Sequence, residues 1–239
     1  MEASDMKVGI MQPYFFPYIG YWQLMNEVDQ YVVYDDVNYK KGGWINRNRI
    51  LVNKAPQYFN LKIWGASPNK LINELEIDDN PSYTGKLLKT IEQNYRKAPF
   101  FDETMALVEA VVKNPQKNLG LFLFDQMNLV SEHLSMNTKI ILSSTLEKDC
   151  SLRAEKKVFE ICRLLGADTY YNSIGGITLY SGEAFRERGM ALKFLEAENI
   201  VYKQFGEEFH SNLSIVDVLM FNGKDETKRL LDRFKIIEG

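Results

Sequence analysis

The sequence predicts an α/β protein with a parallel, Rossmann-like sheet, flanking helices and a helical insert. Short apolar runs, which are typical of buried strands, alternate with helical stretches at both ends of the chain. Between residues 80 and 136 the apolar residues recur at helical spacing only. We therefore predict three parts: residues 1–79 and 137–239 as the N- and C-terminal parts of one α/β domain, and residues 80–136 as the insert.

The first βαβ unit is predicted near the N-terminus. Val8–Met11 is an apolar run short enough for a buried strand, Tyr21–Val28 is helical, and Tyr31–Tyr34 is a second apolar run. Because a crossover of this kind is right-handed and joins parallel strands, we expect these two strands to be parallel. Gln57–Ile63 is predicted as a third strand that ends in a turn.

Helices dominate the middle of the chain, and strand–helix alternation then resumes. The insert is predicted to hold helices at 81–95, Phe100–Val112 and Leu119–Leu134, separated by prolines. The later elements are predicted as a strand at Lys139–Leu142, a helix at Leu152–Leu165, a strand at Asp168–Tyr171, a short helix at Ser181–Arg188, a strand at Ala191–Leu195, and helices at Ser214–Phe221 and Lys224–Phe234.

Composition and charge exclude several classes of function. The formal net charge of -3 argues against a general nucleic-acid or membrane-surface binder. The two cysteines, Cys150 and Cys162, are too few for a disulfide framework and wrongly spaced for a zinc site, and there are only two histidines, so no metal ligand is predicted. No apolar run approaches the roughly 20 residues of a membrane span, and the first residues lack a signal-peptide pattern. A cytoplasmic protein is therefore expected.

Polar and aromatic residues follow the first predicted strand. Ligands of open parallel sheets bind beyond the carboxyl ends of the strands, which is where Gln12, Pro13 and Tyr14 lie. Gly20 and Tyr21 open the following helix, whose free N–H groups favour an anion such as phosphate. The alternative is an aromatic loop that only closes the edge of the sheet.

Two adjacent carboxylates end the second predicted strand. Because side chains alternate along a strand, only one of Asp35 and Asp36 is expected to face the ligand, and the sequence does not say which. That carboxylate could bind a sugar hydroxyl, hold Mg²⁺ with a phosphate, or act as a catalytic base. The alternative is that it caps the following turn.

The strongest local cluster of ligand-binding side chains is Trp44, Asn46, Arg47, Asn48 and Arg49, of which Arg47 is taken as the anion-binding residue. Arginine matches phosphate or carboxylate oxygens with two parallel hydrogen bonds, and tryptophan stacks on a base or a sugar ring. The alternative is a solvated basic hairpin.

A second candidate region follows the strand predicted at Asp168–Tyr171, and its candidate residues are Asn172, Gly175, Gly176 and Tyr180. Glycines allow the backbone to approach a ligand closely, and tyrosines supply walls and hydroxyls. The alternative is a flexible loop.

Later in the chain, Gln204 is a polar residue in apolar surroundings. Ser214 with Asp217 fits a helix N-cap of the capping-box type. The sequence contains no P-loop, GxGxxG, GxSxG or HExxH motif.

These motifs together resemble the WbqC-like family, whose pattern is collinear with almost the whole chain. The matching residues are Gln12-Pro13, Gly20, Asp35-Asp36-Val37, Trp44, Asn46-Arg47, Tyr180, Tyr202, Gln204, Leu213-Ser214-Ile215, Asp217 and Gly223. His210 departs from the pattern, which favours proline at that position.

The resemblance implies a component of bacterial polysaccharide and O-antigen gene clusters that modifies a nucleotide-linked amino sugar. The activity it favours is a transferase that moves an acyl-type or other small group, with the nucleotide-linked sugar and an unidentified group donor as partners. The alternative is a non-catalytic nucleotide-sugar or glycan-binding component of a biosynthetic complex. The cofactor and the oligomeric state stay open.

The first βαβ unit is also similar, more distantly, to the nucleotidylyltransferase-like fold, which carries a His-x-Gly-His motif. Here the aligned segment is Tyr18-Ile19-Gly20-Tyr21, which keeps the glycine but has tyrosines in place of the histidines. The histidines of that motif stabilise phosphate charge in the transition state. The similarity therefore implies nucleotide binding rather than nucleotidyl transfer.

We expect the candidate residues to line one cleft. In that cleft, Arg47 and the helix start at Gly20 would hold a pyrophosphate, and tyrosines would stack on the base or sugar. One carboxylate, Asp35 or Asp36, would accept the proton of the sugar amine.

Overall fold

A six-stranded, mostly parallel sheet forms the centre of the protein, in a computed structural model that describes residues 5–239. The strands follow the order β10-β9-β8-β1-β2-β7, and only β10 runs antiparallel to its neighbour. Their bounds are β1 Lys7–Met11, β2 Gln30–Val33, β7 Lys139–Leu142, β8 Thr169–Ser173, β9 Ala191–Ala197 and β10 Phe234–Glu238. The predicted α/β class with a parallel sheet is confirmed.

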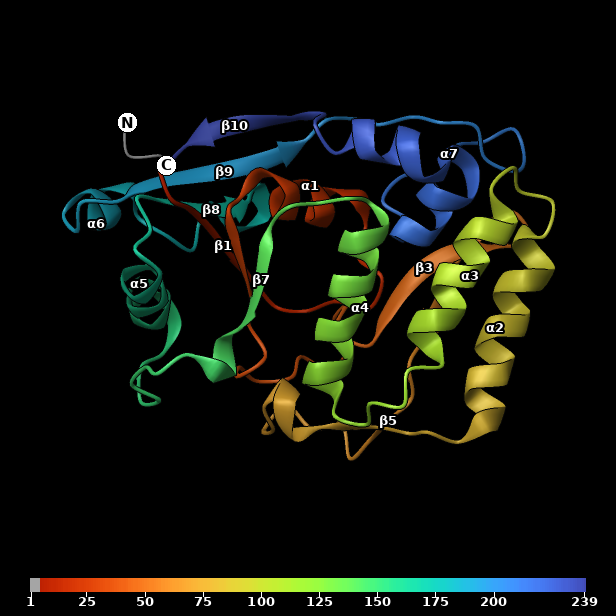
Figure 1. Cartoon of the computed structure of the whole chain (residues 1–239), viewed down its shortest axis with the longest axis horizontal. Helices are drawn as coiled ribbons and strands as arrows, with labels where there is room; N and C mark the ends of the chain where they lie inside the picture. Colours follow the sequence, from red (N-terminus) through yellow and green to blue (C-terminus); the bar gives the residue numbers. More distant parts are fainter. Residues whose placement is uncertain (1–4) are drawn as a thin grey trace.

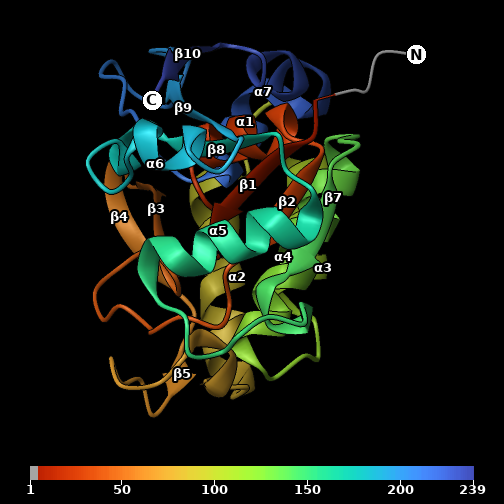
Figure 2. The same ribbon diagram turned by 90° about the vertical axis from the view of Figure 1, so that its left-hand side faces the viewer.

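The direction in which the chain adds strands reverses at β1. Helix α1 (Ile19–Glu27) leads from β1 to β2, and β7 then extends the sheet on the same side. Helix α5 (Ala154–Leu165) carries the chain back across the sheet to β8, on the other side of β1. Figure 2 looks onto α5, which crosses in front of the sheet. The carboxyl ends of β1 and β8 therefore flank a topological switch point, where ligands of such sheets bind.

Two apolar clusters cover the two faces of the sheet. The smaller cluster joins α5 and α6 (Gly182–Arg186) to residues such as Val8 and Tyr170. The larger cluster lies on the α1 face and contains residues of α2 (Pro81–Tyr95), α3 (Phe101–Val112), α4 (Leu119–His133) and α7 (Ile215–Leu230). Figure 1 shows α2, α3 and α4 side by side, and the predicted bounds of the insert, 80 and 136, enclose them. The division into domains stays a prediction.

Local signals explain where the helices begin and end. The Asn80 side chain accepts a hydrogen bond from Ser82 N and Pro81 occupies the first helical position, so α2 begins there. Helix α5 ends at Gly166, whose φ of 65° suits glycine. The two helices predicted near the C-terminus correspond to the two segments of α7, which are separated at Gly223, where a φ of 68° and a ψ of -177° interrupt the helix as predicted.

The strands differ from the prediction in two regions of the chain, and the first region is 47–77. Strand β3 (Arg47–Val52) was not predicted, because its first half is Arg-Asn-Arg and gives no apolar run. It pairs with β4 (Ala55–Asn60), so the strand predicted at Gln57–Ile63 begins earlier and stops at Asn60. A separate short strand, β5 (Ile63–Trp64), pairs with β6 (Glu76–Ile77).

The second difference is at the C-terminus, where the helix predicted to reach Phe234 ends at Leu230 and the antiparallel strand β10 follows. Only three of the five residues of β10 are apolar, so the sequence pattern there was too weak to predict a strand.

Candidate functional site

A cleft of about 440 Å³ opens at the switch point of the sheet. We call it the Arg49 cleft. Its lining residues include Met11 and Ser173, the last residues of β1 and β8, so it lies at the predicted edge. The other lining residues are Tyr14, Tyr18, Tyr21, Leu24, Trp44, Asn48, Arg49 and Asn212. A hollow of about 530 Å³ near α2 is larger, but it is remote from the sheet edge and holds no arginine.

Arg49 gives the cleft its charge. Its Nη2 donates to the carbonyl oxygen of Asn212 at 3.4 Å, and its guanidinium lies 5.8 Å from the centre of the Trp44 ring. Its Nε is buried and has no hydrogen-bond partner within residues 5–239. None of the lining residues, all of which belong to the described part of the chain, is a carboxylate. The cleft therefore presents an uncompensated cation with a spare donor.

Three tyrosines form one wall of the cleft. The rings of Tyr14 and Tyr21 lie 5.5 Å apart, and the Tyr21 hydroxyl donates to the carbonyl oxygen of Gln12 at 2.9 Å. Burial raises the pKa of Tyr14 and of Tyr18, so both stay protonated at neutral pH. A Cβ at Gly20 would lie 2.5 Å from Cε2 of Tyr18. Gly20 is therefore needed for the Tyr18 ring to pack against the start of α1.

The aromatic loop, residues 12–18, is a fixed wall rather than a lid. Asn48 Nδ2 donates to the carbonyl oxygens of Phe15 and Phe16 at 3.2 and 2.9 Å. Gln126 of α4 donates to the carbonyl oxygen of Tyr14 at 3.0 Å and accepts from Phe16 N at 2.9 Å. The Ser214 hydroxyl donates to the Phe16 carbonyl oxygen at 2.8 Å. These buried contacts hold Phe16 at a φ of 41°.

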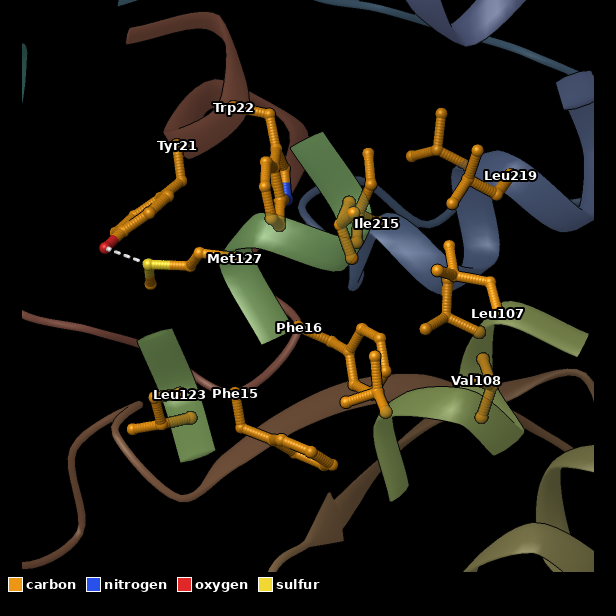
Figure 3. Packing of buried hydrophobic residues seen from close by; sticks show 14 of the residues in the cluster. Phe15, Phe16, Tyr21, Trp22, Leu107, Val108, Leu123, Met127, Ile215 and Leu219 are labelled. Carbon is orange, nitrogen blue, oxygen red and sulfur yellow. Dashed lines mark hydrogen bonds between the residues drawn. The ribbon is translucent and has the colours of Figure 1, made fainter. Parts of the chain in front are cut away.

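The side chains of the aromatic loop reinforce this attachment. Phe15 and Phe16 belong to the larger apolar cluster, together with residues of α3, α4 and α7. Figure 3 shows this packing, with Phe16 near Leu107 and Val108, and the Tyr21 hydroxyl directed at the sulfur of Met127. Pro13 is also buried, whereas Gln12 is half-buried and does not line the cleft.

An aromatic shelf, Trp44 with Tyr58, continues the cleft outward over the β3–β4 hairpin. Tyr58 lies directly across the β3–β4 ladder from Arg49. The ring centres of Trp44 and Tyr58 are 6.0 Å apart. Trp44 is 38% exposed and Tyr58 52%, so both offer area to a ligand. The Arg47 guanidinium lies 4.4 Å from the centre of the Tyr58 ring and donates to the carbonyl oxygen of Gly43 at 3.0 Å.

The structure assigns different surroundings to Arg47 and Asn46 from those expected. Arg47 supports the outer face of Tyr58 and does not line the cleft, and Arg49, on the same face of β3, occupies that place. The Asn46 side chain accepts from the Tyr39 hydroxyl at 2.8 Å and donates to the carbonyl oxygen of Leu61 at 2.9 Å. Both of its polar atoms are therefore occupied within the protein.

Asp35 lies outside the Arg49 cleft and connects β2 to the turn after β7. Its carboxylate is buried and accepts from Ser144 N at 3.0 Å and from the Ser144 hydroxyl at 2.6 Å. A third contact, from Asn73 Nδ2, is 3.4 Å long. Asp35 thus fastens the ends of two neighbouring strands.

Asp36 lies in a second hollow, of about 300 Å³, and not in the Arg49 cleft. Its carboxylate pairs with Lys148 Nζ at 2.8 Å and Lys157 Nζ at 3.0 Å. Burial raises the pKa of Asp36, but hydrogen bonds from Lys148, Ser143 and Lys157 outweigh it and hold the pKa below 3.8. Asp36 is therefore ionised at neutral pH.

The residues from Asn172 to Tyr180, of which the first two end β8, divide between the two faces of the sheet. Asn172 Nδ2 donates to the Tyr170 hydroxyl at 2.7 Å, and that hydroxyl lies 3.5 Å from the hydroxyl of Tyr180. A Cβ at Gly176 would lie 3.0 Å from Asn172 Oδ1, while Gly175 has an open position. This group belongs to the α5 face, and of the segment only Ser173 lines the cleft.

Gln204 belongs to a buried polar network that positions the start of α7. Its Nε2 donates to Asp217 Oδ2 at 2.7 Å, and the hydroxyls of Tyr202 and Tyr95 donate to the same carboxylate at 2.7 and 2.6 Å. Burial raises the pKa of Asp217. Ser214 caps α7 as predicted, through Val216 N at 3.2 Å, but Asp217 contacts the tyrosines instead of completing a capping box.

One of these contact residues, Gln126, was not predicted from the sequence because it lies within an apolar helix. Asn48 was predicted as part of the ligand-binding cluster, whereas its amide holds the backbone of the aromatic loop. A buried amide in an apolar helical face was the available signal for Gln126.

Within residues 5–239, no three His, Cys, Asp or Glu side chains are grouped to hold a metal ion. No helix in that range has both the length and the apolar character to cross a membrane.

Comparison with known proteins adds a family match. A family model described as the WbqC-like protein family matches residues 12–229. The chain is also 25% identical over 220 residues to the uncharacterized protein Rv1507c of Mycobacterium tuberculosis, a span of 90% of this chain and 93% of that protein. No solved structure matches the chain.

Proposed function

Because the chain belongs to the WbqC-like protein family, we propose that its Arg49 cleft binds a nucleotide-linked amino sugar in bacterial surface-polysaccharide (O-antigen) biosynthesis. We further propose that the protein transfers a small acyl-type group to that sugar. The observation that supports the ligand class is Arg49, whose guanidinium lines the cleft with no carboxylate beside it in the described lining and donates only one long hydrogen bond, of 3.4 Å, to a carbonyl oxygen. Phosphate oxygens would give this cation charge-assisted hydrogen bonds, which are about twice as strong as neutral ones.

The shape of the cleft suggests how such a ligand would lie. Its volume of about 440 Å³ falls in the usual range for small-molecule sites, roughly 300–1,000 Å³. With the diphosphate at Arg49, the base would stack on Trp44 and Tyr58 outside the cleft. The sugar would then point inward, toward Ser173 and the hydroxyl of Tyr14.

The transfer itself would form an amide bond between the sugar amine and the acyl carbon of the donor. The bond from that carbon to the leaving group breaks, and the amine proton passes to the leaving group or to water. During this step the acyl oxygen of the donor becomes negatively charged. Tyr14 and Tyr18, whose pKa values are raised by burial, would donate hydrogen bonds to that oxygen rather than accept the amine proton. Asp35 and Asp36 do not line the cleft, so the proposal gives neither of them the role of base.

A second candidate function is a binding component that does not catalyse. It is favoured by the same lining residues of the described chain, which include no carboxylate, imidazole or thiol. Nucleotide-sugar binding through Arg49 is common to both candidates.

One experiment tests binding and then transfer. The purified protein is incubated with a panel of nucleotide sugars, first for thermal shift and then, with acyl donors, for turnover by mass spectrometry. We expect a shift that is strong for wild type and for Arg229→Met, an exposed control, and weak for Arg49→Met. A shift without turnover supports the binding component. If no nucleotide sugar shifts the melting temperature, or the shift survives Arg49→Met, the proposal fails.

A further inference from the structure

A second pocket lies at the carboxyl end of β2, beside the first turn of α5. We call it the lysine pocket. It has a volume of about 300 Å³, and the side chains that matter for its chemistry are Tyr34, Asp36, Arg153 and Lys157. It shares no lining residue with the Arg49 cleft. In Figure 2, α5 runs across the face of the sheet on which this pocket is built.

The lysine pocket holds more positive than negative charge. The side chains of Lys148 and Lys157 are only 2% and 6% exposed, yet they share a single carboxylate, that of Asp36. Arg153 lines the pocket as a third cation, and its Nη1 donates only to the carbonyl oxygens of Cys150 and Leu152. Asp36 is the one carboxylate among the lining residues, all within the described chain. Two buried ammonium groups share one carboxylate, which leaves one buried positive charge in excess, so a further anion would stabilise the group.

The neighbouring carboxylates do not supply that anion. Glu155, in the first turn of α5, accepts a hydrogen bond from Ser181 N at 3.4 Å and does not line the pocket. Asp149 is exposed and accepts from Ser151 N at 2.8 Å. The N-terminus of α5, which starts at Ala154 in the pocket wall, adds to the positive potential there.

We propose that the lysine pocket binds a small dianion of the phosphate class, at a site independent of the Arg49 cleft. Arg153 and Lys157 line the pocket, and Lys148 pairs with its Asp36 without lining it, so three cations face one carboxylate. The two positive charges left over are neutralised by a phosphate dianion and not by a single carboxylate. The pocket of about 300 Å³ admits a phosphate group with a small substituent. Lysine, arginine and a helix start are the groups that hold phosphate in proteins.

Arg153 is the position to vary, because it is exposed and its removal leaves the buried lysine–carboxylate group intact. Arg163→Met, on the exposed side of the same helix, is the matched control. Inorganic phosphate and acetate are titrated at constant ionic strength and pH 7.5, and apparent affinity is read from the melting temperature. We expect phosphate to stabilise wild type and Arg163→Met, acetate to act at least about tenfold more weakly, and Arg153→Met to lose about tenfold or more in phosphate affinity.

Two further results decide the matter. The phosphate effect should persist in Arg49→Met, which separates this pocket from the cleft and makes its test independent of the proposed function. Lys157→Met, checked for folding by circular dichroism, should bind phosphate no better than Arg153→Met does. The inference is overturned if phosphate does not stabilise wild type, if Arg153→Met and Arg163→Met respond alike, or if Arg49→Met abolishes the effect.

Discussion

Asn48→Ala is expected to lower the free energy of unfolding by about 2–4 kcal/mol. The Asn48 amide donates to the carbonyl oxygens of Phe15 and Phe16 and accepts from Arg49 N. The Ser214 hydroxyl still donates to the Phe16 carbonyl oxygen in the variant. The substitution therefore leaves only the Phe15 carbonyl oxygen and the Arg49 N–H without hydrogen-bond partners. An unpaired buried group costs about 1–3 kcal/mol, and two of them, one only partly buried, give the stated range.

Urea unfolding followed by circular dichroism measures this loss. For a chain of this length, about 2–4 kcal/mol corresponds to a fall of roughly 4–16 °C in melting temperature. Asn69→Ala, at an exposed position, should stay within about 0.5 kcal/mol of wild type. Ligand affinity should fall with stability in Asn48→Ala, because the aromatic loop forms the wall of the cleft. A loss no larger than that of the control would refute the reasoning that this amide holds the loop.

Gly20→Ala should destabilise the protein, because the added Cβ would lie 2.5 Å from the ring of Tyr18. Gly85→Ala, where a Cβ would have nothing within 4 Å, should raise the free energy of unfolding by up to about 1 kcal/mol, and thermal unfolding compares the two variants. Asp36→Asn should cost about 3 kcal/mol at neutral pH, because it leaves two buried ammonium groups without a carboxylate. Since the folded pKa lies below 3.8, wild type should lose this stability as the pH falls below that value, and Asp36→Asn should show a flatter curve in urea unfolding from pH 2 to 7. Arg49→Lys should weaken nucleotide-sugar binding about ten- to hundredfold in calorimetry, and Arg47→Lys should change it less than about threefold; equal losses would contradict the choice of Arg49.

The sequence predicted the parallel sheet and the edge at which the cleft opens, because apolar runs and helical periodicity are local signals. It singled out Arg47 as the anion-binding residue, whereas Arg49, from the same predicted cluster, lines the cleft. Arg47 and Arg49 are two residues apart and share one face of β3, and only the placement of the hairpin against the aromatic loop brings Arg49 to the cleft. Local pattern cannot distinguish two positions that are equivalent by strand alternation.

The same limit applies to the two carboxylates. The partners of Asp35 and Asp36, Ser144 and Lys157, lie 109 and about 120 residues further along the chain. Nothing near residue 35 in the sequence indicates that one carboxylate fastens two strands and the other joins two lysines. Strand β3 was missed for a related reason, because its polar half is stabilised by contacts with distant residues.

The way the aromatic loop is fastened bears on when the cleft can form during synthesis. Its backbone is bonded by side chains that lie 32, 110 and 198 residues later in the sequence, at Asn48, Gln126 and Ser214. Contacts of such long sequence separation close late, because the intervening chain must first be ordered. A nascent chain that has not yet reached Ser214 therefore lacks part of the wall, so ligand binding would report completion of the whole fold, and truncated products could not compete for the ligand.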